Sequence, residues 1–361
     1  MELLSCFNAF SRNKRGRFVE ILARPVQRTA ILASIFLCAT CAVTISPAAS
    51  GVADAATDFN GPTGVAVSGN IVLVANGLGN SVTELNAATG SLIRVVKSAS
   101  DDLNRPVGFA VRGNDAWVVN NEGGVITELN AQHGSLVRVI KVGAGQSGDV
   151  GAALSGKILW VANNLLDTLF EFNAATGARI RSIKANGLNG PTCIEVNGSQ
   201  VWVGSITLGV GGGNWLAEFN ASNGSQVSEL TPTWPNFGIS RFAVSGAYLW
   251  VADGYGWVFQ LNSSTGSLVR TIHITTAVLP GADGIVVAGG KVWLADGIGN
   301  SVTELNASNG SLVRVIHAPA DKLSNVTDVA VSGGHVWVTN GGSNSVTELN
   351  ASNGSLVRVI Q

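Results

Sequence analysis

The sequence predicts an all-β protein, a seven-bladed β-propeller with four antiparallel strands in each blade. One stretch, NSVTELNASNGSLVRVI, occurs at residues 300–316 and again, letter for letter, at 344–360. Looser copies of the same unit recur along the chain. The Asn of their ELN-like segment returns every 42–47 residues, as Asn86, Asn130, Asn173, Asn220, Asn262, Asn306 and Asn350. Four-stranded units of this length, repeated about seven times, are typical of propellers.

Each unit contains four short runs rich in Val, Ile, Trp and Thr, which in the last copy are VAVSG, VWVTN, VTELN and SLVRVI. Gly, Asn and Ser separate these runs, as expected of strands joined by turns. An Asn-x-x-x-Gly turn lies between the third and fourth runs, because Asn bonds nearby backbone and Gly accepts a positive φ. One such sheet cannot cover both of its apolar faces, so we expect the units to pack side by side and close into a ring.

The last unit carries its own fourth run, SLVRVI, and this bears on how the ring closes. Many propellers complete the last blade with a strand from the N-terminus. Here we expect either that the first and last blades meet by packing alone, or that residues near 52–60 add an extra strand.

The segment DVAVSGGHVWVTNGGSNSVTELNASNGSLVRVI at 328–360 resembles the YVTN repeat of bacterial and archaeal surface propellers. It is also similar to the NHL and virginiamycin B lyase-like propellers, and the resemblance covers residues 61–360. It implies the fold and not an activity, because these propellers host unrelated functions. The lyase-like enzymes place a His at the head of an innermost strand and a Glu after the Trp strand. This chain has neither there, so lyase activity is not expected.

The first 55 residues do not belong to the repeat. A basic region is followed by an apolar run over 30–45, and Ala53-Asp54-Ala55 fits the small-x-small cleavage rule. We therefore predict a signal peptide over 1–55 and the propeller over 56–361. The protein is expected to be secreted or associated with the cell envelope, with no stable membrane insertion after cleavage. The alternative is that the segment is retained as an anchor.

Composition and repetition restrict the partners. The net charge is −1 and only 12% of residues are charged, so no nucleic-acid partner is expected. We expect a monomer. Cys193 remains alone after cleavage and is expected to be a packed, inert thiol.

Six Trp residues recur in the second strand, which predicts packing between blades: Trp117, Trp160, Trp202, Trp250, Trp293 and Trp337. Glu and Arg recur on strands three and four, which predicts solvated cross-strand ion pairs such as Glu84 with Arg94.

Function in such propellers usually lies on the face that carries the mouth of the central channel, so residues that depart from the repeat there are candidates. Four acids fall near the channel-facing ends of strands, and together they would suit Ca²⁺ or Mg²⁺: Asp253, Asp283, Asp296 and Asp328. The alternative is that these carboxylates cap strand ends in place of Asn. A second set combines aromatic rings with two charged groups and would suit a sugar, an aromatic ligand or a partner surface: Trp215, Trp234, Arg241, Tyr255, Trp257 and Glu195.

We therefore expect a binding or interaction module rather than an enzyme. Its partner would be a small molecule, a glycan or a surface protein, recognised on the channel-mouth face. The alternative is a metal-assisted lactonase, hydrolase or lyase that uses the aspartates. A third reading is a structural envelope protein whose repeats only build a platform.

Overall fold

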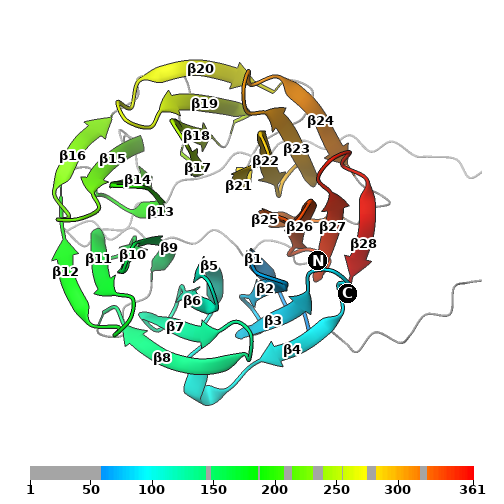
Figure 1. Ribbon diagram of the computed structural model, residues 1–361, viewed down its shortest axis with the longest axis horizontal. Helices are drawn as coiled ribbons and strands as arrows, with labels where there is room; N and C mark the ends of the chain where they lie inside the picture. The colour runs from blue at the N-terminus through cyan, green and yellow to red at the C-terminus, as the bar shows by residue number, and fades with distance from the viewer. Residues whose placement is uncertain are drawn as a thin grey trace, which may run out of the picture. The chain divides into compact units, whose positions relative to one another are not determined.

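The computed structural model describes residues 58–143, 148–185, 188–206, 214–230, 239–253, 255–274, 282–317 and 323–361. These residues form seven four-stranded antiparallel sheets, each made of four consecutive strands. The sheets stand as blades around a central channel, with the first strand of each blade innermost (Figure 1). The predicted seven-bladed β-propeller is thus confirmed, whereas the predicted signal peptide lies outside the described residues.

The first four blades comprise the following strands: β1 (Pro62–Ser68), β2 (Ile71–Asn76), β3 (Ser81–Asn86), β4 (Leu92–Val96); β5 (Pro106–Arg112), β6 (Asp115–Asn120), β7 (Val125–Asn130), β8 (Ser135–Lys141); β9 (Asp149–Ser155), β10 (Ile158–Asn163), β11 (Thr168–Asn173), β12 (Arg179–Ile183); and β13 (Pro191–Asn197), β14 (Gln200–Ile206), β15 (Asn214–Asn220), β16 (Gln226–Leu230). The last three blades comprise β17 (Arg241–Ser245), β18 (Tyr248–Ala252), β19 (Trp257–Asn262), β20 (Leu268–His273); β21 (Ala282–Ala288), β22 (Lys291–Asp296), β23 (Ser301–Asn306), β24 (Leu312–His317); and β25 (Val326–Ser332), β26 (His335–Asn340), β27 (Ser345–Asn350), β28 (Leu356–Ile360). One short 3₁₀ helix, η1 (Ala99–Asp101), follows β4.

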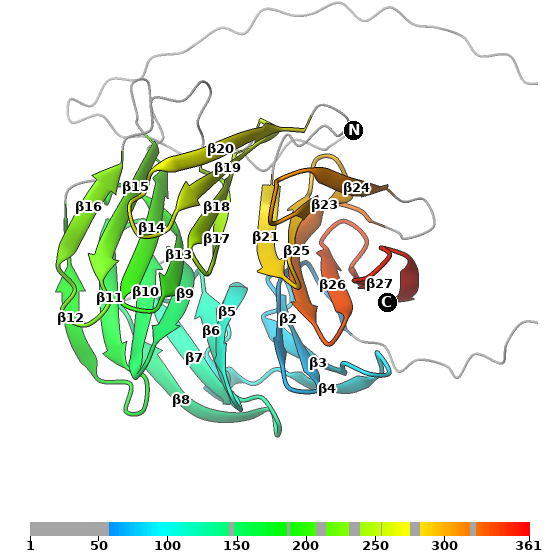
Figure 2. The same cartoon turned by 45° about the horizontal axis from the view of Figure 1, so that its top comes forward.

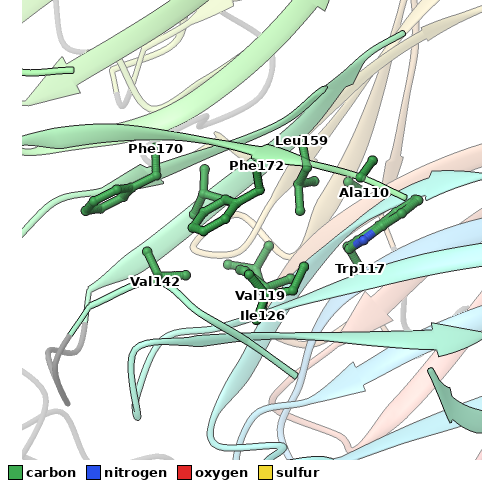
Figure 3. Close-up of a cluster of buried hydrophobic side chains, with 11 residues drawn as sticks. Ala110, Trp117, Val119, Ile126, Val142, Leu159, Phe170 and Phe172 are labelled. Atoms are coloured by element: carbon green, nitrogen blue, oxygen red, sulfur yellow. The ribbon is translucent and has the colours of Figure 1, made fainter. Parts of the chain in front are cut away.

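The hydrophobic core lies between blades rather than within them. Figure 3 shows one such layer, in which Trp117 and Val119 of β6 pack against Leu159 of β10 and Phe172 of β11. All six repeated Trp side chains are at most 1% exposed, so their predicted packing role is confirmed. Burying a ring of this size stabilises the fold by about 2–3 kcal/mol. The fourth strands, by contrast, form the outer wall, as β8, β12 and β16 do in the turned view of Figure 2.

The repeated Glu and Arg residues are paired as predicted, but the glutamates are not solvated. Glu84 lies opposite Arg94 across β3 and β4, and Arg94 Nη1 is 2.7 Å from Glu84 Oε2. The Glu84 side chain is 0% exposed, and its burial raises its pKa to about 7 although Arg94 acts to lower it. The prediction of solvated pairs is wrong because it considered one blade alone, whereas the neighbouring blade covers the carboxylate.

Four of these arginines also join their blade to the next: Arg94, Arg138, Arg314 and Arg358. Beyond its glutamate, the guanidinium donates to a backbone oxygen in the Asn-x-x-x-Gly turn of the following blade. Arg94 donates to Gln132 O at 3.1 Å and Arg138 to Ala175 O at 2.7 Å. A Cβ on the turn glycine Gly134 would lie 2.5 Å from Arg94 Cδ, so this position needs Gly both for its φ of 63° and for space. We call this contact the arginine latch.

A second contact joins the blades at the opposite end. In blades one, three, six and seven, the turn between the second and third strands ends in an Asn or Asp with left-handed backbone, whose side-chain oxygen accepts an N–H from the next blade. Asn80 Oδ1 accepts from Arg105 N at 2.8 Å, and Asp167 Oδ1 accepts from Gly190 N at 2.7 Å. Asn and Asp tolerate this backbone better than other side chains, which explains their recurrence at this position.

The ring closes by packing between complete blades. The first sheet contains only β1–β4 and the last only β25–β28, so no strand is shared among the described residues. Both contacts nevertheless recur at the junction, since Arg358 donates to Ala88 O and Gly61 N donates to Asn344 Oδ1. Phe59 and Trp337 belong to the same buried cluster there. Of the two predicted modes of closure, the described residues show packing. No helix in the described ranges has the length and apolar character needed to cross a membrane.

Candidate binding site at the channel mouth

One end of the ring combines the starts of the innermost strands with the turns between the second and third strands. The register shows this directly, because Pro62 at the start of β1 pairs with Asn76 at the end of β2, and Val326 pairs with Asn340 in the last blade. We call this end the channel-mouth face.

Seven equivalent positions surround the channel near this face, one on each innermost strand: Gly64, Gly108, Gly151, Cys193, Arg241, Gly284 and Asp328. Glycine is required where neighbouring strands approach closely. A Cβ on Gly64 would lie 2.6 Å from Val107 O, and one on Gly284 would lie 2.8 Å from Asp328 Oδ1. Three of the seven positions are not glycine: Cys193 in blade four, Arg241 in blade five and Asp328 in blade seven.

A cavity of about 170 Å³ lies in the channel, and its two sides differ in chemistry. Blades one to three contribute mainly apolar side chains: Val65, Val107, Phe109, Val150 and Ala152. Blades four to seven contribute the charged groups: Glu195, Arg241, Asp283 and Asp328. The charged groups of the cavity, three carboxyl groups and one guanidinium, therefore lie on one side.

Asp328 is fixed in place by backbone donors from two blades. Its Oδ2 accepts a hydrogen bond from Val65 N at 3.0 Å and its Oδ1 from Val329 N at 2.8 Å. Burial raises the pKa of Asp328 to about 6, although these donors and the Arg241 charge favour the carboxylate. Asp283 accepts from Gly297 N at 3.2 Å, and burial raises its pKa while Arg241 acts to lower it.

Glu195 differs from these two because its carboxyl group has no hydrogen-bond partner in the described part of the chain. It is the fifth residue of β13 and lines the cavity. Its enclosure in the channel raises its pKa to about 7, and the negative charge of Asp328 contributes to the shift. Loss of hydration in the channel therefore makes Glu195 costly to ionise, although its side chain is only half-buried.

Asp253 and Asp296, which were predicted beside the other two aspartates, do not line the cavity. Both are buried, Asp253 directly after β18 and Asp296 as the last residue of β22. Asp253 Oδ1 accepts from Tyr255 N at 2.9 Å and from Trp257 N at 2.6 Å, and Asp296 Oδ1 accepts from Gly299 N at 2.9 Å. Burial raises the pKa of Asp296 to about 6. Within the described ranges, no three His, Cys, Asp or Glu side chains are grouped as a metal ion would need.

The predicted aromatic set is distributed over several places. Tyr255 is 69% exposed at a turn on the channel-mouth face. Trp257 is half-buried and stacks on His273 of the outer strand β20, with 3.9 Å between ring centroids. Trp215 is half-buried opposite Ser205, and Trp234 lies outside the described residues. Neither Trp215 nor Trp257 lines the cavity. The cavity instead brings together Glu195 and Arg241, predicted with the aromatic residues, and Asp283 and Asp328, predicted as metal ligands.

Sequence reasoning did not single out three further residues on this face. Leu78, Leu165 and Ile298 are 72%, 65% and 68% exposed. Each lies two residues after the Asn or Asp that ends the second strand (Asn76, Asn163 and Asp296), and Tyr255 likewise lies two residues after Asp253. The signal was present in the sequence, because NGLGN and DGIGN put a large apolar residue at the centre of a polar turn.

Cys193 is buried and forms no disulfide in the described structure, as expected of a packed thiol. Burial raises its pKa to about 11, because a thiolate would lose its hydration there, so the group stays protonated at neutral pH.

Comparison with known proteins supports the fold. The family model described as outer membrane protein assembly factor BamB matches residues 212–359. The computationally designed Ika8 protein is 14% identical, with 84% of this chain and 88% of that chain covered and a TM-score of 0.61. Hydrazine synthase of Kuenenia stuttgartiensis is 19% identical, with 84% and 99% covered and a TM-score of 0.65. No curated protein matches the chain. The comparisons thus indicate a repeat-built β-propeller, and at these identities the structural likeness concerns the fold alone.

Proposed function

We propose that the protein is an interaction module of the cell envelope that recognises a partner protein with its channel-mouth face. The observation that carries this proposal is the set of exposed apolar side chains at the turn centres, which we call the apolar tips: Leu78, Leu165, Tyr255 and Ile298. Apolar side chains of the fourth strands are also exposed, but the four tips are the most exposed large apolar residues of the described structure, and exposed apolar patches are typical of interaction sites.

The backbone around the tips is held by hydrogen bonds. Gly77 N donates to Gly61 O at 2.8 Å and Asn164 N donates to Gly148 O at 2.8 Å, so each turn is bonded to the loop that precedes its own blade. Those two glycines also make room for the tips, since a Cβ on Gly61 would lie 2.6 Å from Leu78 Cγ. A preorganised apolar group loses little entropy on binding, which favours recognition.

The turn itself does not require an apolar centre. The equivalent residue is Glu122 in the second blade and Gly342 in the last, and both turns keep backbone hydrogen bonds to the preceding loop. Because the scaffold accepts either residue, the apolar tips are better explained by a contact outside the blade.

Two further considerations support the proposal. Binding is favoured over metal-assisted catalysis because Asp253 and Asp296 are already engaged by the backbone of their own turns. An envelope location is supported by the predicted signal peptide over 1–55 and by the matched family model, whose description concerns outer membrane protein assembly.

Site-specific photo-crosslinking tests this proposal. A photoreactive amino acid is placed at Leu78 or Ile298 on the channel-mouth face, and at Val137 or Val313 on the outer wall as a matched exposed apolar control. In cells that produce the protein, the tip positions should give one discrete crosslinked band and the outer positions should not. Crosslinks that arise equally from the outer wall, or not at all from the tips, would overturn the proposal.

A further inference from the structure

We infer that blades five and six present a docking surface for an acidic segment of the partner, and that this surface binds more tightly below about pH 6 than at neutral pH. The surface consists of the apolar tips Tyr255 and Ile298 and of the charged groups around them at the channel-mouth end. This inference rests on the proposed function, because it concerns the chemistry of the partner that meets the same tips.

The two blades differ from blades one to three at two equivalent positions. In blades one to three, Asn ends the second strand and Lys lies at the end of the fourth: Asn76 with Lys97, Asn120 with Lys141, and Asn163 with Lys184. In blades five and six the pairs are Asp253 with His273 and Asp296 with His317. The first three blades therefore keep a fixed positive charge here, whereas in blades five and six both members of the pair can gain or lose a proton.

The register of blade six brings its pair to one end of the sheet. Asp296 of β22 lies opposite Ser301 of β23, which lies opposite His317 of β24. Asp296 is buried and His317 is exposed. The imidazole is therefore open to a partner, while the carboxylate lies beneath the surface.

The carboxylates of these blades also hold the backbone of the tips. Tyr255 N donates to Asp253 Oδ1 at 2.9 Å. The glycine N–H groups on either side of Ile298 donate to Asp283 at 3.2 Å and to Asp296 at 2.9 Å. The corresponding glycine N–H groups beside the tip of blade one donate to backbone carbonyls, at 2.8 and 3.0 Å. Titratable acceptors thus lie directly under the tips of blades five and six.

Burial makes these acids titrate closer to neutral pH. It raises the pKa of Asp296 to about 6, with Asp283 acting in the same direction and His317 against it. Burial also raises the pKa of Asp253, although backbone donors and the charge of His273 favour the carboxylate. The pKa of Asp283 is raised by burial too, against a neighbouring guanidinium. A partner that covers this face removes more water from the acids and raises these pKa values further, so its binding takes up protons and is tighter at low pH.

The charge of the surface reverses over the same range. In the described parts of blades five and six, the charged or titratable side chains at this end are Arg241, Asp253, His273, Asp283, Asp296 and His317. Asp328 of blade seven lies near Asp283 and adds to the negative charge. At neutral pH the acids outnumber Arg241. Below about pH 6 the acids take up protons and exposed imidazoles become positive, so the surface attracts an acidic segment whose apolar side chains meet the tips.

The test measures binding of the peptide acetyl-Asp-Leu-Asp-Leu-Asp-amide to the full chain at about pH 5.5 and about pH 7.5, by calorimetry and ligand-observed NMR. The Asp side chains of a peptide stay ionised at both values. We expect the affinity to be about tenfold or more higher at the lower pH, with protons taken up on binding. The same peptide with Lys in place of Asp should show no such gain. Equal affinity of the acidic peptide at both pH values, or no binding at either, would overturn the inference.

A double variant locates the effect. Asp296→Asn with His317→Lys gives blade six the pair that blade one carries, beside the Ser and Thr that both blades share on the third strand. It should reduce the gain in affinity at low pH, and the chain alone should take up roughly one to two fewer protons between the two pH values. Glu229→Gln, which changes an exposed acid on the outer strand β16, is the control and should leave the gain unchanged. An unreduced gain in the double variant would contradict the assignment, as would proton uptake that Ca²⁺ suppresses, because the acids would then be metal ligands.

Photo-crosslinking at the two pH values separates this inference from the proposed function. Ile298 should crosslink more strongly at about pH 5.5 than at about pH 7.5, whereas Leu78, beside Asn76 and Lys97, should respond less. Crosslinks from neither tip at either pH overturn the proposed function and with it this inference. Crosslinks from both tips with the same response to pH overturn the inference alone.

Discussion

The arginine latch at the ring junction provides the sharpest test of how the propeller is held closed. Arg358 Nε lies 2.7 Å from Glu348 Oε2, and Arg358 Nη2 donates to Ala88 O of the first blade at 3.3 Å. The Glu348 side chain is 0% exposed and also contacts His335, whose Nδ1 lies 2.6 Å from Glu348 Oε1. In Arg358→Met the apolar stem is kept and the charge is lost.

The expected cost follows from these contacts. Removing one partner of a buried ion pair costs about 3–5 kcal/mol, because the other charge stays buried without compensation. Arg358 is itself 30% exposed, so the lower end applies. The lost bond to Ala88 adds about 1 kcal/mol. Burial already raises the pKa of Glu348, so this acid can take up a proton and offset part of the loss. We expect the free energy of unfolding to fall by about 3 kcal/mol.

Urea denaturation measures the loss, and Arg314→Met is the matched control at an ordinary blade boundary. Arg314 makes the same two contacts, with Nε 2.8 Å from Glu304 Oε2 and Nη2 donating to Ser352 O at 3.5 Å. Glu304 also keeps Lys291, whose Nζ lies 2.6 Å from its Oε1, so if the junction is a boundary like the others, Arg314→Met should cost no more than Arg358→Met. A loss below about 1 kcal/mol in Arg358→Met would refute the latch as a source of stability.

Three further outcomes are expected. The pKa of Glu84 rises from 4.5 to about 7 on folding, so the folded chain binds this proton more tightly than the unfolded chain. The free energy of unfolding should therefore fall by at most about 3 kcal/mol as the pH rises from 4.5 to 7. Urea midpoints measured across that range would show the fall. Gly134→Ala should cost about 1–2 kcal/mol more than Gly113→Ala in thermal unfolding, because both have positive φ but only Gly134 faces Arg94 at 2.5 Å. Cys193 should react with Ellman's reagent only as fast as the chain unfolds, and rapid labelling of the native protein would contradict its burial.

Much of the fold could be predicted because it depends on local periodicity. The Asn-x-x-x-Gly turns and the Trp in each second strand set the strand order and the core without knowledge of neighbouring blades. The contacts between blades could not be predicted in the same way. Arg94 is ten residues from Glu84, within the same blade, but 38 residues from Gln132 in the next blade. The contact with Gln132 belongs to the packing between blades, and local spacing in the sequence does not predict it.

The candidate site was predicted in its parts but not in its grouping. Asp283 and Asp328 were assigned to a metal site, and Glu195 and Arg241 to an aromatic ligand site. The four line one cavity because their strands converge at the channel, a relation that no spacing in the sequence encodes. The apolar tips were missed since a single exposed Leu in a turn carries no information until the turns are seen to share one face.

The repeat and its exceptions follow from the same geometry. Where an arginine meets the turn of the next blade, as Arg94 meets Gly134 and Gln132, a change in one copy disturbs two blades. Arg241 at the channel end of β17 is exposed and takes no part in a latch, whereas the equivalent Gly64 and Gly284 lie against the neighbouring innermost strand. The positions in this set that differ from glycine are Cys193, Arg241 and Asp328. The charged side of the cavity therefore lies where the innermost strands depart from the glycine of the other blades, with Arg241 and Asp328 in its lining.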